Sequence, residues 1–318
     1  MRFGSPGPAA PATLLAALWL PGLLAGVVHA DPLERSFEVK PDVRVEIELL
    51  SGKIELRGID ANEVRVRANG ELEIDGSKSG RRVSIRAPSS GWRPWAGGAS
   101  VDLEVELPRN SRITARTRNG KIEAEGVAGE LVLHSASGEI EVEGAPREAY
   151  LETMSGEIKF EGEHSEVVAR TLNGEIELKG VTGAVEASTM SGQIKVEGDA
   201  IERAELRTMS GEIELDASLA EGARVEAKSY SGQVRLRLPD DTSARFDVQS
   251  FNGGIQSDFP SQPFDVEDDQ GGWRHGPGRR RSFVIGDGDA RISIESFSGG
   301  VKIEQGGRSA PAIPPGVE

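Results

Sequence analysis

A glycine that follows Ser or Asn recurs at nearly constant spacing along this chain, and this repeat constrains the fold more than any other feature. Gly120, Gly138, Gly156, Gly174 and Gly192 are equally spaced. The spacing then widens slightly for the next copies, at Gly211, Gly232 and Gly253, and further copies lie at Gly52 and Gly299. The chain is therefore built from internal repeats.

Apolar residues lie at alternate positions on both sides of each repeated glycine. Around Gly156 they are Ala149 and Leu151 before the glycine and Ile158 and Phe160 after it. A period of two is typical of strands rather than helices. Each repeat therefore predicts two short strands joined through a corner that contains glycine.

Strands this short cannot bury their apolar side chains alone, so the copies are expected to stack. We predict an all-β fold, specifically a single-stranded parallel β-helix (β-solenoid). It would have about 18–21 residues per coil and roughly ten coils, each adding about 4.8 Å. An up-and-down sandwich is the alternative, but it does not require one fixed spacing. Hexapeptide and calcium-binding nonapeptide solenoids have similar periods, yet their residue patterns are missing here.

Residues 1–30 are typical of a secretory signal peptide. They contain one Arg, an apolar run from Leu14 to Val28, and small residues ahead of Asp31. An uncleaved membrane anchor is the alternative. We expect an exported protein, periplasmic or extracellular at the cell surface, that does not span the membrane after cleavage behind Ala30.

The remaining chain is expected to form one domain with two interruptions. The β-solenoid is predicted over residues 31–304, with insertions at 88–100 and 258–289 that are rich in Gly, Pro and charged residues. Residues 305–318 contain several prolines and are predicted to be a disordered C-terminal tail.

Composition excludes several classes of function. The chain has no Cys, which excludes disulfides, thiolate metal sites and a cysteine nucleophile. It has 37 basic and 52 acidic residues, a net charge of −15, and removal of Arg2 with the signal peptide makes this −16. Binding to nucleic acid through phosphate neutralisation is therefore not expected.

Two polar columns accompany the repeat. From Gly120 onward Thr or Ser lies three residues before each glycine, for example Thr153, and Ser or Asn lies one before it, for example Ser155. Both columns share the parity of the core residues, so both are predicted to point inward and to satisfy the turning backbone. A catalytic nucleophile is needed once, beside a base, whereas these residues recur in every unit. We interpret them as structural.

The column two residues before each glycine has the opposite parity and is largely apolar. We name as candidate partner-binding residues Met154, Leu172, Met190, Met209, Tyr230, Phe251 and Phe297. Two interpretations remain open. Either these side chains form an exposed row that binds a partner, or the corner turns them into a second small core or a loop covers them.

The insertions carry further candidates. Trp92, Trp95 and Trp273 are all the tryptophans after the signal peptide, and in exposed loops they would bind a protein or glycan. Covering an open sheet edge is an equally good interpretation. His134, His164 and His275 share no ligand spacing, so no zinc site is predicted. No catalytic, cofactor-binding or metal-binding residue is named.

The run VDLEVELPRNSRITARTRNGKIEAEGVAGELVLHSASGEIEVEG, residues 101–144, resembles the bacterial "putative adhesin" family. This family comprises β-strand-repeat domains of unknown function related to the head GIN adhesin domain. The resemblance extends over most of residues 37–304, closing with 291–303. It implies a single-stranded parallel β-helix that is exported or faces the cell envelope, and it supplies no catalytic residues.

These observations favour an exported, non-enzymatic interaction module of the cell envelope, similar to an adhesin, with a protein or glycan partner. A ligand-binding component of envelope-stress signalling is the alternative. A polysaccharide-active β-helix enzyme fits less well, because no acidic and basic cluster stands out at one repeat.

Overall fold

The structure is a computed structural model of the 318-residue chain. It describes residues 33–87, 100–163, 166–260, 262–263 and 279–306. In these residues the secondary structure is all β, and the strands join into one sheet that winds in a solenoid-like arrangement. The predicted signal peptide lies outside the described residues, as does the predicted tail from residue 307 on, whereas Gln305 still belongs to the last strand.

Strands that lead into the repeated glycines, which we call corner glycines, form one set. They are β2 (Arg44–Ser51), β8 (Arg112–Asn119), β10 (Glu130–Ser137), β12 (Glu148–Ser155), β14 (Glu166–Asn173), β19 (Ala244–Ser250) and β23 (Ala290–Ser298). Strands that leave the corners form the second set. They are β3 (Ile54–Ile59), β9 (Ile122–Val127), β11 (Ile140–Gly144), β13 (Ile158–Glu161), β18 (Val234–Leu238), β20 (Ile255–Ser257) and β24 (Val301–Gln305). Three long strands leave one corner and continue into the next: β15 (Ile176–Ser191), β16 (Ile194–Ser210) and β17 (Ile213–Ser231).

Equivalent residues of neighbouring repeats pair in parallel. Leu151 of β12 pairs with Leu133 of β10, one repeat earlier, and with Ala169 of β14, one repeat later. In β15 and β16 the register shifts fall in the middle of these long strands, between Lys179 and Ala184 and away from the corners. The extra residue in the unit that ends at Gly211 therefore leaves the corners aligned.

Close contact between successive corners explains the recurrent glycine. A Cβ added to Gly156 would lie 2.1 Å from the carbonyl oxygen of Gly138, far inside van der Waals contact. The N–H of Gly138 donates to the carbonyl of Ser155 at 2.9 Å. Any side chain at this position would push neighbouring repeats apart. The Ser-Gly phrase is thus a packing device.

The core lies between the two sets of strands. Ile158 and Phe160 are buried, as predicted, and so is Thr153, whose hydroxyl donates to the carbonyl of Gly138 at 3.3 Å. The prediction for the second polar column is wrong. Ser155 and its equivalents, which the alternation placed inward, are exposed because the chain leaves strand geometry at the corner. Two consecutive side chains, Met154 and Ser155, therefore face outward.

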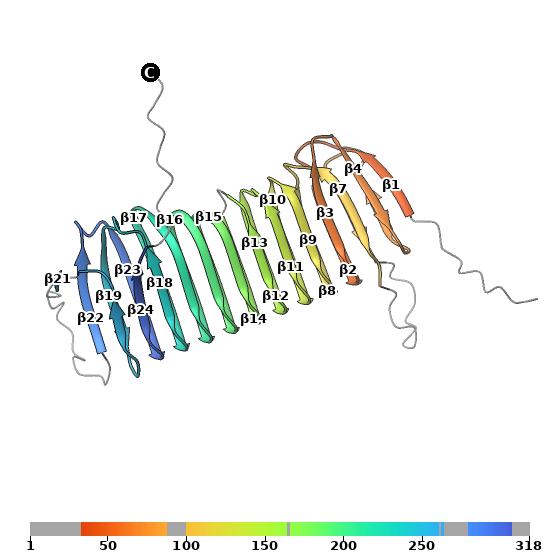
Figure 1. The fold of residues 1–318 in the computed structure, drawn as a ribbon. Coiled ribbons are helices and arrows are strands. Elements are labelled where there is room, and N and C mark those ends of the chain that lie inside the picture. The colour runs from red at the N-terminus through yellow and green to blue at the C-terminus, as the bar shows by residue number, and fades with distance from the viewer. Residues whose placement is uncertain (1–32, 88–99, 164–165, 261, 264–278, 307–318) are drawn as a thin grey trace, which may run out of the picture. The chain divides into compact units, whose positions relative to one another are not determined.

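The stacking order departs from chain order at both ends (Figure 1). The strands β23 and β24, drawn in dark blue, lie between β17–β18 and β19–β20, although β19 precedes them in the chain. Two further strands, β6 (Arg82–Arg86) and β7 (Leu103–Pro108), pair with β2 and β3 on the side opposite β8 and β9. The first and last repeats, those of Gly52 and Gly299, thus each lie one unit inside the stack.

Antiparallel strands cover the edges. At the N-terminal edge these are β1 (Leu33–Glu38), β4 (Glu63–Ala68) and β5 (Glu73–Gly76). At the other edge β22 (Arg279–Ile285) pairs with β19, and β21 (Gln262–Pro263) pairs with β22. The predicted insertion at 258–289 therefore contains an edge strand, because an uncovered β19 would leave a row of unpaired backbone groups.

Candidate functional site

The outward face of the strands that lead into the corners carries an exposed row of apolar side chains. Each lies two residues before a corner glycine, and we call the row the apolar stripe. In stacking order its members are Leu50, Met154, Leu172, Met190, Met209, Tyr230, Phe297 and Phe251, with Arg118 and Ala136 between the first two. Exposure ranges from 41% at Phe297 to 56% at Met154 and Tyr230, and Phe251 is partly buried.

Leu50 was not among the predicted site residues. It is 51% exposed and lies two residues before Gly52, so the repeat itself contained the signal. The predicted apolar column began only after Gly52, although Gly52 itself fits the repeat.

Stacked aromatic rings form the C-terminal end of the apolar stripe. The ring centroids of Tyr230 and Phe297 lie 4.7 Å apart at 4°, and those of Phe297 and Phe251 lie 4.7 Å apart at 13°. Phe297 can lie between the other two only because its unit is placed inside the stack. Both faces of the Phe297 ring are therefore covered, together with one face each of Tyr230 and Phe251.

A parallel row of polar residues runs beside the apolar stripe, four residues before each corner glycine. We call it the charged row: Glu48, Arg116, His134, Glu152, Arg170, Ser188, Arg207, Lys228, Glu295 and Gln249, in stacking order. An open groove of about 510 Å³ lies between the two rows, where Met209, Tyr230 and Phe297 face Arg207 and Lys228. The groove thus has an apolar wall and a polar wall.

Most of the charged row is already paired. Arg170 contacts Glu186 at 2.6 Å and lies 5.6 Å from the ring centroid of Tyr150. Lys228 contacts Glu226 at 2.5 Å and Glu295 at 3.6 Å. Arg116 differs, because no carboxylate among the described residues lies within ion-pair distance of it.

Of His134, His164 and His275, only His134 lies within the described residues. Its Nδ1 lies 3.1 Å from Glu152 Oε2, and its ring lies 5.5 Å from that of Tyr150. Burial lowers the pKa of His134, with Glu152 opposing the shift. The imidazole is therefore mainly neutral at pH 7. His164 and His275 lie outside the described residues.

The outward face of the strands that leave the corners is a ladder of ion pairs. Lys121 lies 2.8 Å from Glu123, 3.4 Å from Glu139 and 2.5 Å from Glu141, carboxylates from two adjacent units. The hydrogen bond from Lys159 holds the pKa of Glu139 below its usual value. Carboxylates aligned along the stack are thus neutralised by interleaved lysines.

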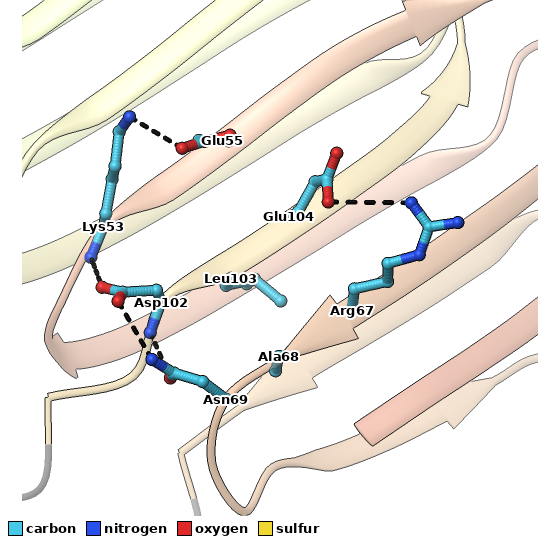
Figure 2. Close-up of a pocket in the computed structure, with 8 residues that line it drawn as sticks. All are labelled: Lys53, Glu55, Arg67, Ala68, Asn69, Asp102, Leu103 and Glu104. Carbon is cyan, nitrogen blue, oxygen red and sulfur yellow. Dashed lines mark hydrogen bonds and ion pairs between the residues drawn. The ribbon is translucent and has the colours of Figure 1, made fainter. Parts of the chain in front are cut away.

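A second pocket lies where the N-terminal antiparallel strands meet the first unit (Figure 2). Asp102 accepts from the backbone N–H of Lys53 at 3.2 Å and from the side-chain amide of Asn69 at 3.0 Å. The N–H of Asp102 donates to the Asn69 amide oxygen at 2.7 Å, and Arg67 lies 3.7 Å from Glu104. These groups satisfy one another, so the pocket holds the end strands together.

The described residues offer no alternative centre. Within them no three His, Asp or Glu side chains are grouped to hold a metal ion. No helix in the described part of the chain is suited to crossing a membrane. Trp92, Trp95 and Trp273 lie outside the described residues. The apolar stripe is therefore the strongest candidate.

Comparison with known families decides the classification. Residues 45–304 match the model of Toastrack DUF4097. The chain belongs to the Toastrack DUF4097 family. The resemblance to the "putative adhesin" family of domains of unknown function is thereby confirmed. No curated protein matches the Toastrack chain.

Solved structures similar to this Toastrack chain include three bacterial proteins. A putative cell adhesion protein from Clostridium sporogenes is 11% identical, with 86% of this chain and 100% of that one covered and a TM-score of 0.23. A putative adhesin from Bacteroides fragilis is 12% identical, with 86% and 96% covered and a TM-score of 0.30. A putative lipid binding protein from Parabacteroides distasonis is 13% identical, with 85% and 96% covered and a TM-score of 0.35. At these TM-scores the similarities carry no argument about function.

Proposed function

We propose that this Toastrack protein is an exported, non-enzymatic interaction module of the cell envelope that binds its partner through the apolar stripe. Its scaffold is a single-stranded parallel β-helix of roughly ten coils with about 18–21 residues each, over residues 31–304. Cleavage of residues 1–30 would release it into the periplasm or to the cell surface.

One observation carries the proposal. Large apolar side chains stay exposed at successive units from Met154 to Phe297, on a surface where the neighbouring charged residues pair with one another. Exposed apolar surface on this scale is usually an interaction site. Folding does not require it, because the core already has its own apolar residues on the inner face.

Two features support a non-enzymatic role. The hydroxyls that recur beside the corners have structural partners, as with Thr153 and Gly138. The groove beside the apolar stripe contains no serine hydroxyl with a neighbouring histidine, since its lining has no histidine. The partner would be a protein or a glycan of the envelope, and Trp92, Trp95 and Trp273 would add to the same surface.

Binding to isolated cell envelopes tests the proposal. We expect purified residues 31–318 to cosediment with envelopes, and the variant Met190→Ser/Met209→Ser to lose at least about tenfold in affinity, since two apolar contacts are removed. The control Glu143→Ser/Glu161→Ser changes two exposed residues on the other outward face. Equal binding by both variants, or turnover of an envelope polysaccharide by the protein, would contradict the proposal.

A further inference from the structure

We propose that the partner of the apolar stripe is a second copy of this chain, docked antiparallel about a twofold axis between the units of Gly174 and Gly192. The inference rests on the proposed function in one respect, namely that the apolar stripe is an interaction surface. It goes further by naming the occupant and the register of contact.

The geometry of the aromatic rings favours a protein surface over a sugar. Sugars bind aromatic residues by lying on a ring face. In the apolar stripe both faces of Phe297, and one face each of Tyr230 and Phe251, are covered within the stack at 4.7 Å. Fewer ring faces are therefore open to a sugar, whereas the side of the stack suits contact with protein side chains.

The surface is large enough for a dimer. Nine steps of about 4.8 Å give the apolar stripe a length of about 43 Å. With the charged row its width is about 13 Å, four residues along a strand. The two copies would bury on the order of 1,200 Å² in total, at the lower end of stable interfaces.

An antiparallel twofold pairs the members of the apolar stripe by complementary size. The axis lies between the units of Gly174 and Gly192, so units at equal distances on opposite sides of it face each other across the interface. Leu172 of one copy therefore lies opposite Met190 of the other, and Met154 lies opposite Met209. Further out, the small Ala136 lies opposite the large Tyr230. Arg118, which interrupts the apolar stripe, lies opposite Phe297, and the aliphatic part of its side chain can pack against the ring edge. Each pair occurs twice in an isologous contact.

The charged row selects this register. Arg116, which has no ion-pair partner among the described residues of its own chain, lies opposite Glu295, and Glu152 lies opposite Arg207. Arg170 lies opposite Ser188, while the mainly neutral His134 lies opposite Lys228. The register therefore makes four opposite-charge pairs per dimer.

Other registers and the parallel arrangement place like charges together. A shift of one unit sets Arg170 against Arg207 in one direction and Arg116 against Lys228 in the other. A twofold axis along the apolar stripe itself would set Arg118 against its own copy. Like charges at an interface cost affinity and exclude wrong pairings. The antiparallel register centred between Gly174 and Gly192 is the one that avoids them.

Sedimentation velocity and light scattering of purified residues 31–318 test the proposal. We expect a dimer, and a monomer for Leu172→Asp/Met190→Asp, which places charge at the twofold axis and touches no core residue. Arg116→Glu and Glu295→Arg alone should each weaken the dimer by roughly tenfold, since two attractive pairs become repulsive. The double variant Arg116→Glu/Glu295→Arg should restore it. Arg81→Glu and Glu221→Arg are matched controls at exposed positions away from the apolar stripe.

A monomer at all concentrations, a dimer unaffected by Leu172→Asp/Met190→Asp, or a charge swap that fails to restore affinity would each overturn the proposal. Circular dichroism confirms that each variant is folded. The proposed function can fail separately. A monomer that still binds envelopes through the apolar stripe would refute the dimer alone, leaving a lipid or another protein as the occupant. A dimer that binds no envelope would refute the proposed function alone.

Discussion

The middle of the solenoid and its two ends are built by different rules from the same repeat. From Gly138 to Gly211 each unit pairs with the units before and after it in the chain, so stacking order equals chain order. At the ends the first and last repeats, those of Gly52 and Gly299, are each enclosed by a segment from elsewhere in the chain. These two repeats therefore keep backbone pairing on both sides.

The difference has a physical reason. A unit in the middle has a paired neighbour on each side, whereas an outermost unit presents unpaired backbone groups that invite aggregation. Here the outermost positions belong to antiparallel strands such as β1 and β22, whose sequences LERSFE and RRRSFVI are rich in charge. The regular repeats are thereby kept inside, where their aligned apolar residues can pack.

Removing the enclosed C-terminal repeat should have the largest effect. Truncation after Asp289 deletes β23 and β24, which hold β17–β18 and β19–β20 together. Besides the small Ala290, four large core residues are lost: Ile292, Ile294, Val301 and Ile303. At about 2 kcal/mol each, this removes on the order of 8 kcal/mol, comparable to the whole stability of a domain. We expect loss of the cooperative unfolding transition in calorimetry. A truncated chain that melts like the intact one would contradict this stacking order.

A buried charge in a middle unit should have the next largest effect. Ile158→Asp places an unpaired carboxylate in the core and should lower the free energy of unfolding by about 4 kcal/mol. Ser155→Ala, three residues away and exposed, should change it by less than about 0.5 kcal/mol. Urea unfolding followed by circular dichroism measures both. Similar values for the two variants would remove the distinction between inner and outer positions.

Deleting a whole middle unit should destabilise the protein less than the truncation after Asp289 or Ile158→Asp. Removal of residues 139–156 joins Gly138 to Glu157 and brings two equivalent units into register, because units here are interchangeable. At roughly 0.1 kcal/mol per residue, the loss is about 2 kcal/mol. We expect a folded chain with a modestly lower Tm. Failure to fold would show that the middle units are not equivalent.

Acid should weaken the ion-pair ladder of the middle units. This should have the smallest effect on stability of the changes considered. Lysine partners lower the pKa values of Glu139 and Glu177. A carboxyl group with a lowered folded pKa stabilises the protein above its unfolded pKa, near 4.3, and loses this contribution as the pH falls through the folded value. The contribution of the ladder to Tm should therefore be constant above about pH 5.5, and its loss should lower Tm by a few degrees below about pH 4. A Tm that rises on acidification would contradict the ladder.

The repeat predicted the strands, the corner glycines and the core because each depends on local alternation and on spacing. It could not predict the exposure of Ser155, since parity holds only while the chain remains a strand. It also could not predict the enclosure of the Gly299 unit, because units with the same pattern can stack in any order. Long-range order is decided by which edges must be covered, and the covering strand β22 lies within what looked like an irregular insertion.

The candidate site also depends on the stacking order of the units. The apolar column could be predicted from the sequence, whereas its exposure and its stacked aromatic end could not. Tyr230 and Phe251 are sequence neighbours in the repeat, yet Phe297 lies between them. The continuity of the apolar stripe is thus a consequence of the enclosed end.

Disulfide trapping tests the stacking order most directly, because the chain has no cysteine of its own. Ser231 and Ser298 are exposed parallel partners, close enough for a disulfide after substitution by cysteine. Under mild oxidation Ser231→Cys/Ser298→Cys should form an intramolecular disulfide, whereas Ser231→Cys/Asn252→Cys should not, since one unit separates these positions. Disulfide formation in the second pair but not in the first would show that stacking follows chain order and would contradict the account.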